Sequence, residues 1–494
     1  MLNRDRVLLV HPLGYDADAA AGDVSRIANI MPPIGLASIA ACLERRGIRT
    51  AVIDCYARPG SDRAIRERLL SERPALIGLS CTTSGFLDGI RIAELARATL
   101  PGIRTVFGGP HVSALKESLF PRFPAMDFAV VGEGEETLAE LAERGGEDPS
   151  GVRGIVFREG GDGPARFTGH REREIELDTL PFPAYEKLDG FPHSYKLPLF
   201  NYPRVPNTSC ISSRGCPYSC SYCDRSVFGR SFRFNSAEYL YEHLRHLKER
   251  FGVRHVNFYD DQFTFDRGRI GEFARRMIDR SLGMTFNCIV RAEHIDREMV
   301  RLMKAAGCWM MNLGIETGDS GLLAAHRRHA DLDRTGRAIR TIKEAGIRTK
   351  GLLMMGLPGE TEESVRKSMD YVFSHPIDDF NLTKFTPFPG SPIYEKIRSL
   401  GDFDEDWEKM DCMHFLFVTK GMTRERLEAL YREFHVAHYR RPKVLLGYVA
   451  MLWRSPDSWV RFARNLGTFL KFACFARRLT DEGSGCGSRR GPGG

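Results

Sequence analysis

The sequence predicts an α/β protein in which two successive series of β/α units precede a helical C-terminal region. Short apolar runs alternate with helical patterns over residues 1–145 and again over 205–395, which is typical of parallel sheets. The intervening residues 146–204 are rich in Gly, Arg and Asp and read as a linker. Helical patterns fill 396–478, and the Gly-rich residues 479–494 are expected to be disordered.

The composition is that of an ordinary globular protein. The 494 residues are 42% hydrophobic and 27% charged, which suits two or three domains. The net charge of +7 is small for this length and concentrated near the C-terminus, so nucleic acid is not an expected partner. The 12 cysteines are scattered apart from one cluster, and no signal peptide precedes the strand pattern at Val7. We therefore expect a protein of the reducing cytoplasm.

Residues 1–145 are expected to form a Rossmann-like, flavodoxin-like sheet. Apolar runs predict five buried strands, at 6–12, 50–56, 75–83, 104–110 and 128–136. Helical patterns separate them, including 35–47 and 87–100.

Small residues follow several of these strands. Ligands of open α/β sheets bind beyond the carboxyl ends of the strands, where glycine permits close approach of the backbone. The candidate binding residues at these ends are Ser80, Thr82, Thr83, Gly108, Gly109, His111, Gly132 and Glu133.

The second β/α series supplies about six units. A first strand enters a cysteine-rich loop, and strand-like runs follow at 255–265, 284–295, 309–319, 349–363 and 379–394. Active sites of barrels lie at the C-terminal ends of the strands. Polar residues and glycines fall there in this sequence, namely Asp260, Asp261, Arg291, Glu316, Gly356 and Gly359.

Cys216, Cys220 and Cys223 form a C-x3-C-x2-C cluster, with Tyr222 directly before the last thiol. Three thiolates at this spacing can bind three irons of a [4Fe–4S] cluster and leave the fourth iron open. The alternative is a structural zinc site, which needs four ligands, usually as two separated pairs. Cys210 is available as a fourth thiolate, but its spacing fits no zinc pattern.

The cysteine motif resembles that of the radical S-adenosylmethionine (SAM) superfamily. The resemblance implies a partial (β/α)6 barrel and reductive cleavage of SAM to a 5′-deoxyadenosyl radical. It also implies that Cys216, Cys220 and Cys223 hold the cluster and that an electron donor such as flavodoxin or ferredoxin reduces it. The segment 177–188, with Pro181 and Pro183, resembles the connector that precedes the SAM domain in this group.

The same resemblance implies how SAM is bound. Asp260 is expected near the SAM amino group, and Arg291 and Glu316 near its polar end or ribose. Tyr222 and the turn Gly356–Gly359 are expected to pack the adenine. The structural alternative is that Arg291 and Glu316 pair with each other inside the barrel.

The order of motifs in residues 1–145 resembles the cobalamin-binding domains attached to many radical SAM enzymes. These motifs are PPIGLASIAACLERRG, IGLSCTT, FGGPHVSA and VVGEGEET. The resemblance implies that the nucleotide tail of cobalamin lies beside Ser80, Thr82, Gly108 and Gly109. The D-x-H-x-x-G motif that supplies a lower axial histidine elsewhere is absent; His111 is read as a loop residue near the tail, with axial ligation as the alternative. A flavodoxin-like domain without ligand is the alternative for the whole segment.

Two helical patterns dominate the C-terminal region. One covers 427–449 and is helical until Pro442; the other covers 454–478, with Ser455 as cap and Pro456 near its first turn. The second is amphipathic and basic, so it either packs on the barrel, which we favour, or contacts an anionic membrane surface. The longest apolar run, Val444–Trp453, has about half of the ~20 residues that a spanning helix needs.

The resemblance covers roughly residues 1–440 and is to the group related to the anaerobic Mg-protoporphyrin monomethyl ester cyclase. It implies an enzyme that functionalises an unactivated C–H bond of a small molecule. The first hypothesis is methyl transfer through methylcobalamin to a hydrophobic substrate. The second is oxidative cyclisation or rearrangement of a tetrapyrrole- or lipid-like substrate without methylation. A non-catalytic cobalamin or redox sensor is the third.

Overall fold

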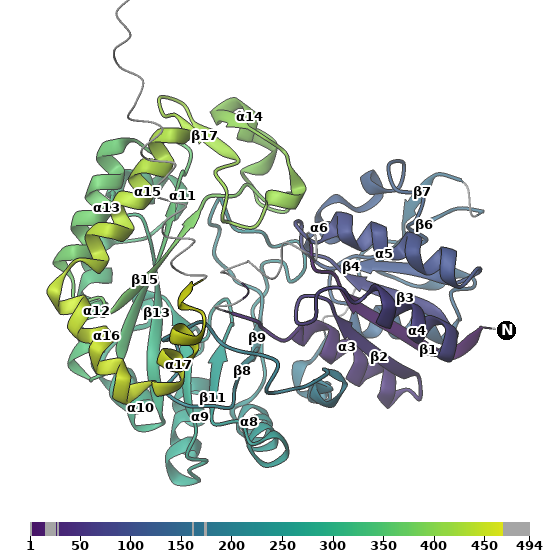
Figure 1. Cartoon of the computed structure of the whole chain (residues 1–494), viewed down its shortest axis with the longest axis horizontal. Coiled ribbons are helices and arrows are strands. Elements are labelled where there is room, and N and C mark those ends of the chain that lie inside the picture. Colours follow the sequence, from purple (N-terminus) through teal and green to yellow (C-terminus); the bar gives the residue numbers. More distant parts are fainter. Residues whose placement is uncertain (1, 15–25, 27–28, 161–162, 172–174, 468–494) are drawn as a thin grey trace, which may run out of the picture.

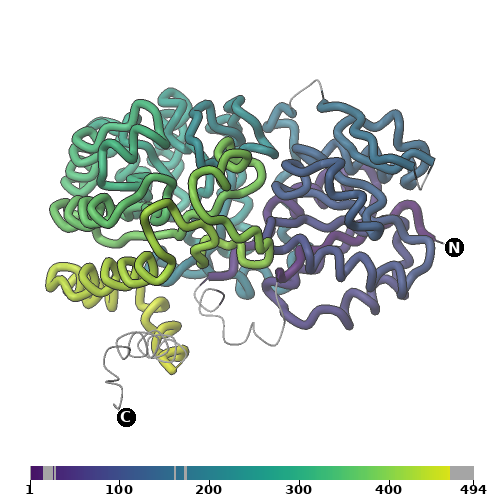
Figure 2. The backbone as a smooth tube through the Cα atoms, turned by 90° about the horizontal axis from the view of Figure 1, so that it is seen from above, coloured from purple at the N-terminus to yellow at the C-terminus, as the bar shows by residue number. Residues whose placement is uncertain are grey.

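The computed structural model describes residues 2–14, 26, 29–160, 163–171 and 175–467 (Figure 1). Two sheets dominate it, a seven-stranded sheet in the N-terminal part and a six-stranded sheet after it. Figure 2 shows the two parts side by side along the long axis of the molecule. The predicted α/β fold class is confirmed, with a Rossmann-like domain first and a partial barrel second.

The N-terminal sheet has the strand order β2-β1-β3-β4-β5-β6-β7. The first five strands are parallel, and the order 2-1-3-4-5 is that of flavodoxin-like folds. These strands are β1 (Asn3–His11), β2 (Arg49–Asp54), β3 (Pro74–Ser80), β4 (Arg104–Gly108) and β5 (Phe128–Val130). The helices between and after them are α3 (Ile34–Arg45), α4 (Asp62–Glu72), α5 (Phe86–Thr99), α6 (Pro110–Leu115) and α7 (Glu135–Glu143).

The last two strands of this sheet lie where the sequence predicted only linker. β6 (Ile155–Arg158) pairs antiparallel with β5, and β7 (Ala165–Phe167) pairs antiparallel with β6. The prediction of a linker over 146–204 is therefore wrong for its first third. Strand β6 is only four residues long, which gives too short an alternation to stand out in the sequence.

The second sheet is parallel and has the order β15-β14-β13-β12-β11-β8, so each strand pairs with the next one along the chain. Its strands are β8 (Asn207–Cys210), β11 (His255–Phe258), β12 (Thr285–Val290), β13 (Cys308–Glu316), β14 (Arg348–Met355) and β15 (Asp379–Lys384). The helices are α8 (Ala237–Phe251), α9 (Arg267–Asp279), α10 (Arg297–Ala305), α11 (Ser320–His326), α12 (Leu332–Glu344) and α13 (Glu362–Ser374). This is the expected six-unit partial barrel.

Side-chain caps fix where the barrel helices begin. Asp266, Asp296 and Asp331 each accept a hydrogen bond from a backbone N–H in the first turn of the helix that follows. Such caps satisfy N–H groups that have no partner inside the helix. Helices α9 and α10 start shortly after the ends of β11 and β12, which leaves loops at the edge where a site can form, whereas α12 follows α11.

One hydrophobic core joins the two parts. Residues of α3 and α7 on one face of the N-terminal sheet belong to the same buried cluster as the residues of the barrel. The connector residues Ala184, Tyr185 and Leu188 lie within that cluster. Burial of apolar area on this scale holds the two sheets in a fixed relation.

The C-terminal region forms three described helices, α15 (Arg424–Tyr439), α16 (Pro442–Arg454) and α17 (Pro456–Arg464), on the barrel side (Figure 2). Pro442 begins a separate helix in its first turn, where proline is tolerated. Before these helices come α14 (Ile397–Leu400), β16 (Gly401–Phe403) and β17 (Phe417–Thr419).

Helix α17 packs on the chain segment that leads into the barrel. The buried Arg461 donates to the Leu197 carbonyl over 2.9 Å and to the Tyr202 hydroxyl over 2.7 Å. For the described part of the helix predicted over 454–478, this is the packing on the barrel that we favoured. The remainder of that helix, 468–478, and the predicted tail 479–494 lie outside the described residues. Within the described residues, no helix is long and apolar enough to cross a membrane.

Candidate active site

The three motif cysteines lie in one loop between two short strands, β9 (Ser213–Arg214) and β10 (Arg233–Phe234). This loop follows β8 at the carboxyl edge of the barrel sheet. The thiols of Cys216, Cys220 and Cys223 are free and partly exposed. They are therefore accessible to a cofactor at the end of the barrel where active sites of such folds lie.

The arrangement of the three cysteines fits a [4Fe–4S] cluster better than a single metal ion. Among the described residues, no three His, Cys, Asp or Glu side chains are placed to hold one metal ion together. A cubic cluster does not need such convergence, because each thiolate binds a different iron. Cys210, the fourth thiol of the zinc alternative, is fully buried on β8, and its Sγ lies 3.5 Å from Nδ1 of His243 on α8. The zinc alternative thus gains no support.

A histidine that the sequence analysis did not single out holds the cysteine loop. Nδ1 of His326 lies 2.7 Å from the Ser221 hydroxyl, and Nε2 lies 2.8 Å from the Pro358 carbonyl. Because a carbonyl only accepts, Nε2 carries the proton and Nδ1 accepts from Ser221. Burial lowers the pKa of His326, which keeps it neutral in this bridge. The cysteine loop is thereby tied to helix α11 and to the turn after β14.

Arg291, at the end of β12, stacks on the cysteine loop. Its guanidinium lies 3.7 Å from the ring centre of Tyr218. Nε and Nη2 donate to the Glu293 carboxylate over 3.2 and 3.1 Å. The arginine is thus positioned by an aromatic face on one side and a carboxylate on the other.

Glu316, at the end of β13, has a left-handed backbone with φ of 66°. Its carboxylate lies 3.5 Å from Nη1 of Arg327, and that arginine also donates to the Gly314 carbonyl over 2.8 Å. Burial raises the pKa of Glu316, while the charge of Arg327 and the hydroxyl of Tyr222 oppose that shift. Backbone strain of this kind concentrates at functional sites.

Arg291 and Glu316 do not pair directly. The buried Arg327 lies 3.7 Å from Glu293 as well as near Glu316, so the order of charges is Arg291–Glu293–Arg327–Glu316. Glu293 and Arg327 were not singled out from the sequence. Glu293 follows Arg291 by two residues at a strand end, and this position could have marked it as a candidate site residue. Arg327 follows a helix, and nothing in its sequence position indicates a role at the site.

Asp260 is buried behind the strand ends. Its Oδ1 accepts from the Ser212 backbone N–H over 2.8 Å and from the Ser213 hydroxyl over 2.6 Å, while Oδ2 has no partner among the described residues. Burial raises its pKa. The carboxylate joins the ends of β8 and β11, and its contact with the SAM amino group stays a prediction. The neighbouring Asp261 is exposed.

Tyr222 and the turn after β14 meet in one apolar group. Tyr222 packs against the cluster that contains Leu357, and Gly356 and Gly359 have φ of 93° and 85°. Only glycine adopts such angles without strain, so the chain can fold back tightly here. The residues expected to pack the adenine are thus brought together, and their contact with adenine stays a prediction.

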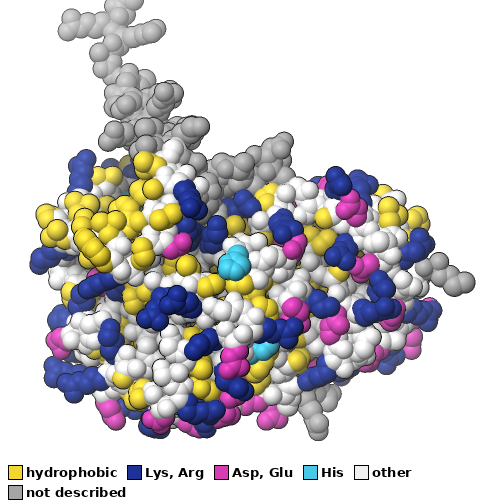
Figure 3. Space-filling view, turned by 60° about the horizontal axis from the view of Figure 1, so that its bottom comes forward, with side chains coloured by type: hydrophobic (Ala, Val, Ile, Leu, Met, Phe, Trp, Pro, Cys, Tyr) yellow, Lys and Arg dark blue, Asp and Glu magenta, His cyan; other side chains and the backbone are white. Residues whose placement is uncertain are grey.

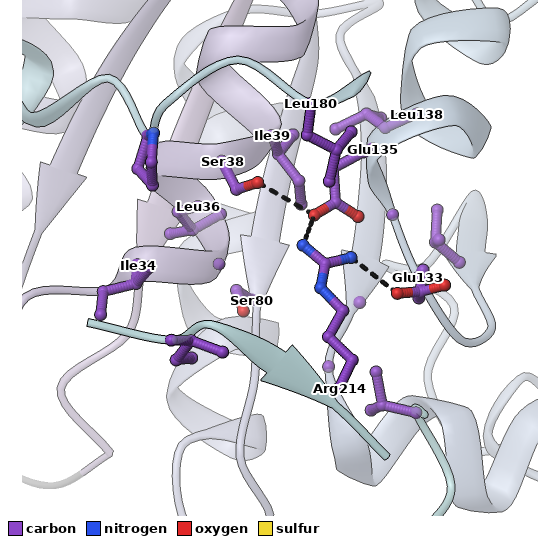
Figure 4. A pocket seen from close by; sticks show the side chains of 18 of the residues that line it. Ile34, Leu36, Ser38, Ile39, Ser80, Glu133, Glu135, Leu138, Leu180 and Arg214 are labelled. Carbon is purple, nitrogen blue, oxygen red and sulfur yellow. Dashed lines mark hydrogen bonds and ion pairs between the residues drawn. The ribbon is translucent and has the colours of Figure 1, made fainter. Parts of the chain in front are cut away.

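A pocket lies where the N-terminal sheet meets the cysteine loop (Figure 4). The empty space in the pocket, together with the open solvent at its mouth, is about 1160 Å³. Five of the residues predicted to bind cobalamin line it, namely Ser80, Gly108, Gly109, Gly132 and Glu133. Val227 and Phe228 of the cysteine loop line it from the other side.

Gly109 shows why the wall of the pocket at the ends of β3 and β4 must be free of side chains. Its φ is 102°, and a Cβ atom there would lie 2.5 Å from the carbonyl oxygen of Cys81. Any larger residue would push β4 away from β3 at the carboxyl edge of the sheet. The glycine lets the backbone itself form the wall of the pocket.

Ion pairs close the pocket on the barrel side (Figure 4). Arg214 contacts Glu133 over 2.6 Å and Glu135 over 2.5 Å, and Arg233 contacts the second oxygen of Glu133 over 2.9 Å. The Ser38 hydroxyl donates to Glu135 over 3.0 Å. Glu133 therefore lines the pocket as a paired carboxylate rather than as a free one.

Thr82, Thr83 and His111 lie away from this pocket. Thr82 is exposed, and its hydroxyl accepts from the Gly85 N–H over 3.2 Å. His111 is in helix α6, not in a loop, and is fully buried, with its ring centre 4.5 Å from that of Trp407. Its Nδ1 lies 3.3 Å from the Thr83 hydroxyl, and burial lowers its pKa to about 3. These three residues are not among those that line the space available to a ligand.

Comparison with known protein families decides what the two parts are. The family described as the radical SAM superfamily matches residues 210–372, and the B12 binding domain matches residues 22–142. The chain is a cobalamin-dependent radical SAM enzyme. Its cofactors are a [4Fe–4S] cluster, SAM and cobalamin.

Curated relatives of this cobalamin-dependent radical SAM enzyme include methyltransferases and cyclases. An uncharacterized methyltransferase of Pyrococcus horikoshii is 28% identical over 84% of this chain and 89% of its own. The anaerobic magnesium-protoporphyrin IX monomethyl ester cyclase of Rubrivivax gelatinosus is 26% identical over 87% of this chain and 77% of its own.

Solved structures agree in fold. The radical SAM methyltransferase TsrM from Kitasatospora setae superposes with a TM-score of 0.69 at 18% identity, covering 93% of this chain and all of that one. The cobalamin-dependent radical SAM enzyme OxsB superposes with a TM-score of 0.70 at 16% identity, covering 96% of this chain and 75% of that one.

Proposed function

We propose that this radical SAM enzyme methylates an unactivated carbon of a hydrophobic small molecule. The observation that carries the proposal is the shared wall of the two cofactor regions. Val227, Phe228 and Arg214 belong to the cysteine loop and its entry strand, and the same residues line the pocket of the B12 domain. When bound, the cluster and SAM supply a radical that abstracts hydrogen, and cobalamin supplies the methyl group.

The chain's own residues hold these groups and keep their surroundings fixed. Cys216, Cys220 and Cys223 hold the cluster, and the charges from Arg291 to Glu316 bind the polar end of SAM. Ser80, Gly108 and Gly109 line the space for the cobalamin tail. The bridge from Ser221 through His326 to Pro358 fixes the cysteine loop, which matters because a misplacement of about 1 Å can cost 100-fold in rate.

Aromatic side chains beside the cysteine loop support a hydrophobic substrate. The rings of Phe232 and Phe265 lie 4.6 Å apart, and the ring of Phe265 lies 5.6 Å from that of His294. Phe234 and Phe265 are exposed. Exposed aromatic groups next to a candidate active site are typical of surfaces that bind apolar ligands.

Relatives favour methylation but keep cyclisation as the second candidate. Five of the curated relatives are named as methyltransferases or a methylase, including the bacteriochlorophyllide d C-12(1)-methyltransferase of Chlorobaculum tepidum and the hopanoid C-3 methylase of Methylococcus capsulatus. Three are named as the anaerobic cyclase. Both chemistries need the same cofactors, so product analysis must separate them.

The deciding experiment counts the two products of SAM. Reconstituted enzyme is incubated without oxygen with cobalamin, SAM, a reductant such as flavodoxin or ferredoxin, and a lipid and pigment extract as substrate pool. Substrate-dependent 5′-deoxyadenosine and S-adenosylhomocysteine in near-equal amounts support methylation. Deoxyadenosine without S-adenosylhomocysteine contradicts methylation and supports the cyclase alternative.

A further inference from the structure

Helix α16 is apolar on its outer face as well as on its inner one. Leu446 and Trp453 expose 68% and 77% of their surfaces, whereas Val444 and Met451 are buried on the opposite side. The exposed apolar residues fall at helical spacing along one stripe: Leu445, Leu446, Val449, Leu452 and Trp453. We call these five residues the α16 face. A helix that is apolar all round is normally covered on all sides, so this face lacks a partner among the described residues.

Neighbouring helices extend this surface. Exposed apolar residues lie at the end of α15, on α17 and just after α17, namely Val436, Tyr439, Val460 and Leu466. Figure 3 shows hydrophobic side chains gathered on this part of the molecule, bordered by Lys and Arg. Scattered single apolar residues need no explanation, but a contiguous group of this kind marks an interaction site.

The charged residues on α16 and on the turns directly before and after it have one sign. Arg440, Lys443, Arg454 and Arg464 are exposed, and none of them forms an ion pair with a described residue. No acidic residue occurs in the sequence from 434 to 456. The surface is thus complementary to a partner that is apolar beneath an anionic layer.

We propose that the α16 face docks on the surface of a membrane that contains anionic lipids. Helix α16 has 13 residues and is about 20 Å long, whereas the hydrocarbon core of a bilayer is about 30 Å thick. It therefore lies in the interface, with Leu446 and Trp453 among the acyl chains and the four cations at the lipid phosphates. Indole rings such as that of Trp453 favour this boundary.

A second copy of the chain fits this surface less well. A two-fold dimer through the α16 face would bring the same four cations of both copies together, with no acidic residue of the 434–456 segment to separate them. Like charges in a closed interface oppose association, whereas lipid phosphates neutralise them.

Vesicle binding by the full cofactor-loaded chain tests the proposal. We expect the enzyme to sediment with vesicles of phosphatidylcholine mixed with phosphatidylglycerol, not with phosphatidylcholine alone, and to detach as salt is raised. Lys443→Gln with Arg454→Gln should weaken the partition coefficient roughly 25-fold, since each cation contributes about five-fold. Fluorescence of Trp453 should shift to the blue on binding and be quenched by brominated lipid, with Trp453→Phe as the blank.

Leu446→Glu should abolish vesicle binding, and its matched control is Leu70→Glu. Leu70 exposes 57% of its surface on α4, in the N-terminal part of the chain. Absorbance of the bound cofactors checks that each variant is folded. The proposal is overturned if the enzyme ignores anionic vesicles or if Leu446→Glu binds them as well as Leu70→Glu. It is also overturned if the only effect of Leu446→Glu is to break a dimer, or if its only effect is to abolish binding of another protein.

Discussion

Arg214 and Glu135 form a buried ion pair across the junction of the two sheets, with 2.5 Å between Nη2 and Oε1. Their side chains expose only 13% and 6% of their surfaces. Burial alone would raise the pKa of Glu135, but the charge and hydrogen bond of Arg214 outweigh it and lower the pKa. Arg214 stands two residues before Cys216, and Glu135 is the first residue of α7. The pair thus connects the pocket of the B12 domain to the cysteine loop.

Arg214→Met should destabilise the enzyme and weaken cobalamin binding together. Removing one partner leaves a buried carboxylate without a counter-charge, which costs about 3–5 kcal/mol. Urea unfolding measures the stability, and titration followed by cobalamin absorbance measures the affinity.

The matched control for Arg214 is Arg49→Met, which breaks the exposed pair with Asp5. Exposed pairs contribute about 0–1 kcal/mol, so that variant should stay close to the wild type in both measurements. Arg214→Met with unchanged cobalamin affinity would mean that the pair serves the fold alone.

The Arg214–Glu135 pair is also an example of a contact that could not be predicted from the sequence. The two residues are 79 positions apart, and nothing in composition or periodicity relates such positions. The same holds for Arg327, whose guanidinium reaches Glu316 only because α11 returns the chain to the end of β13. Contacts of this kind depend on how elements pack, which a single sequence does not record.

Local patterns, in contrast, were sufficient for the architecture. The strands β2, β3, β12 and β14 begin within one residue of the predicted starts, because buried parallel strands are continuous apolar runs. The Gly-rich ends of β4 and β5 correctly marked residues that line a pocket. His111 shows the limit of such marks, because a polar residue near this edge can face the core as easily as the pocket, and here it packs on Trp407.

Cys220→Ala should remove the cluster and SAM cleavage while cobalamin stays bound. Two thiolates cannot hold a cube that needs three corners, and the pocket of the B12 domain does not contain Cys220. Iron content, the visible absorbance of the cluster and 5′-deoxyadenosine measure the first effect; cobalamin absorbance after gel filtration measures the second. Cys288→Ala is the control, because this thiol is buried in the barrel core. SAM cleavage by Cys220→Ala would show that the cluster is held elsewhere.

Glu316→Gly should be more stable than Glu316→Ala. Both variants lose the carboxylate near Arg327, but only glycine relieves the left-handed backbone, which costs about 1–2 kcal/mol for other residues. At Glu293, whose backbone is not left-handed, the glycine variant should instead be less stable than the alanine variant, by about 0.5–1 kcal/mol. Urea unfolding of the four variants checks the sign at each site. Equal stabilities at position 316 would contradict the strain, and both variants at 316 should bind SAM more weakly than wild type.

Glu360 should make the stability of the enzyme fall as pH rises. The carboxyl group is buried in the turn after β14, where it accepts from the Gly356 N–H, and burial raises its pKa from 4.5 to about 8. Between these values the folded chain holds a proton that the unfolded chain has released. The free energy of unfolding therefore falls by about 1.4 kcal/mol per pH unit across this window.

Glu360→Gln removes this titration and keeps an oxygen that accepts from Gly356. The stability of the variant minus that of the wild type should therefore increase steadily as pH rises from about 5 to 8. Glu425→Gln is the control: backbone hydrogen bonds lower the pKa of Glu425, so this exposed carboxylate is ionised in both states and its difference should stay constant. Urea unfolding in matched buffers gives both curves. A flat difference for Glu360→Gln would mean that the carboxylate is already ionised in the folded chain, with the N–H donors of the turn outweighing burial.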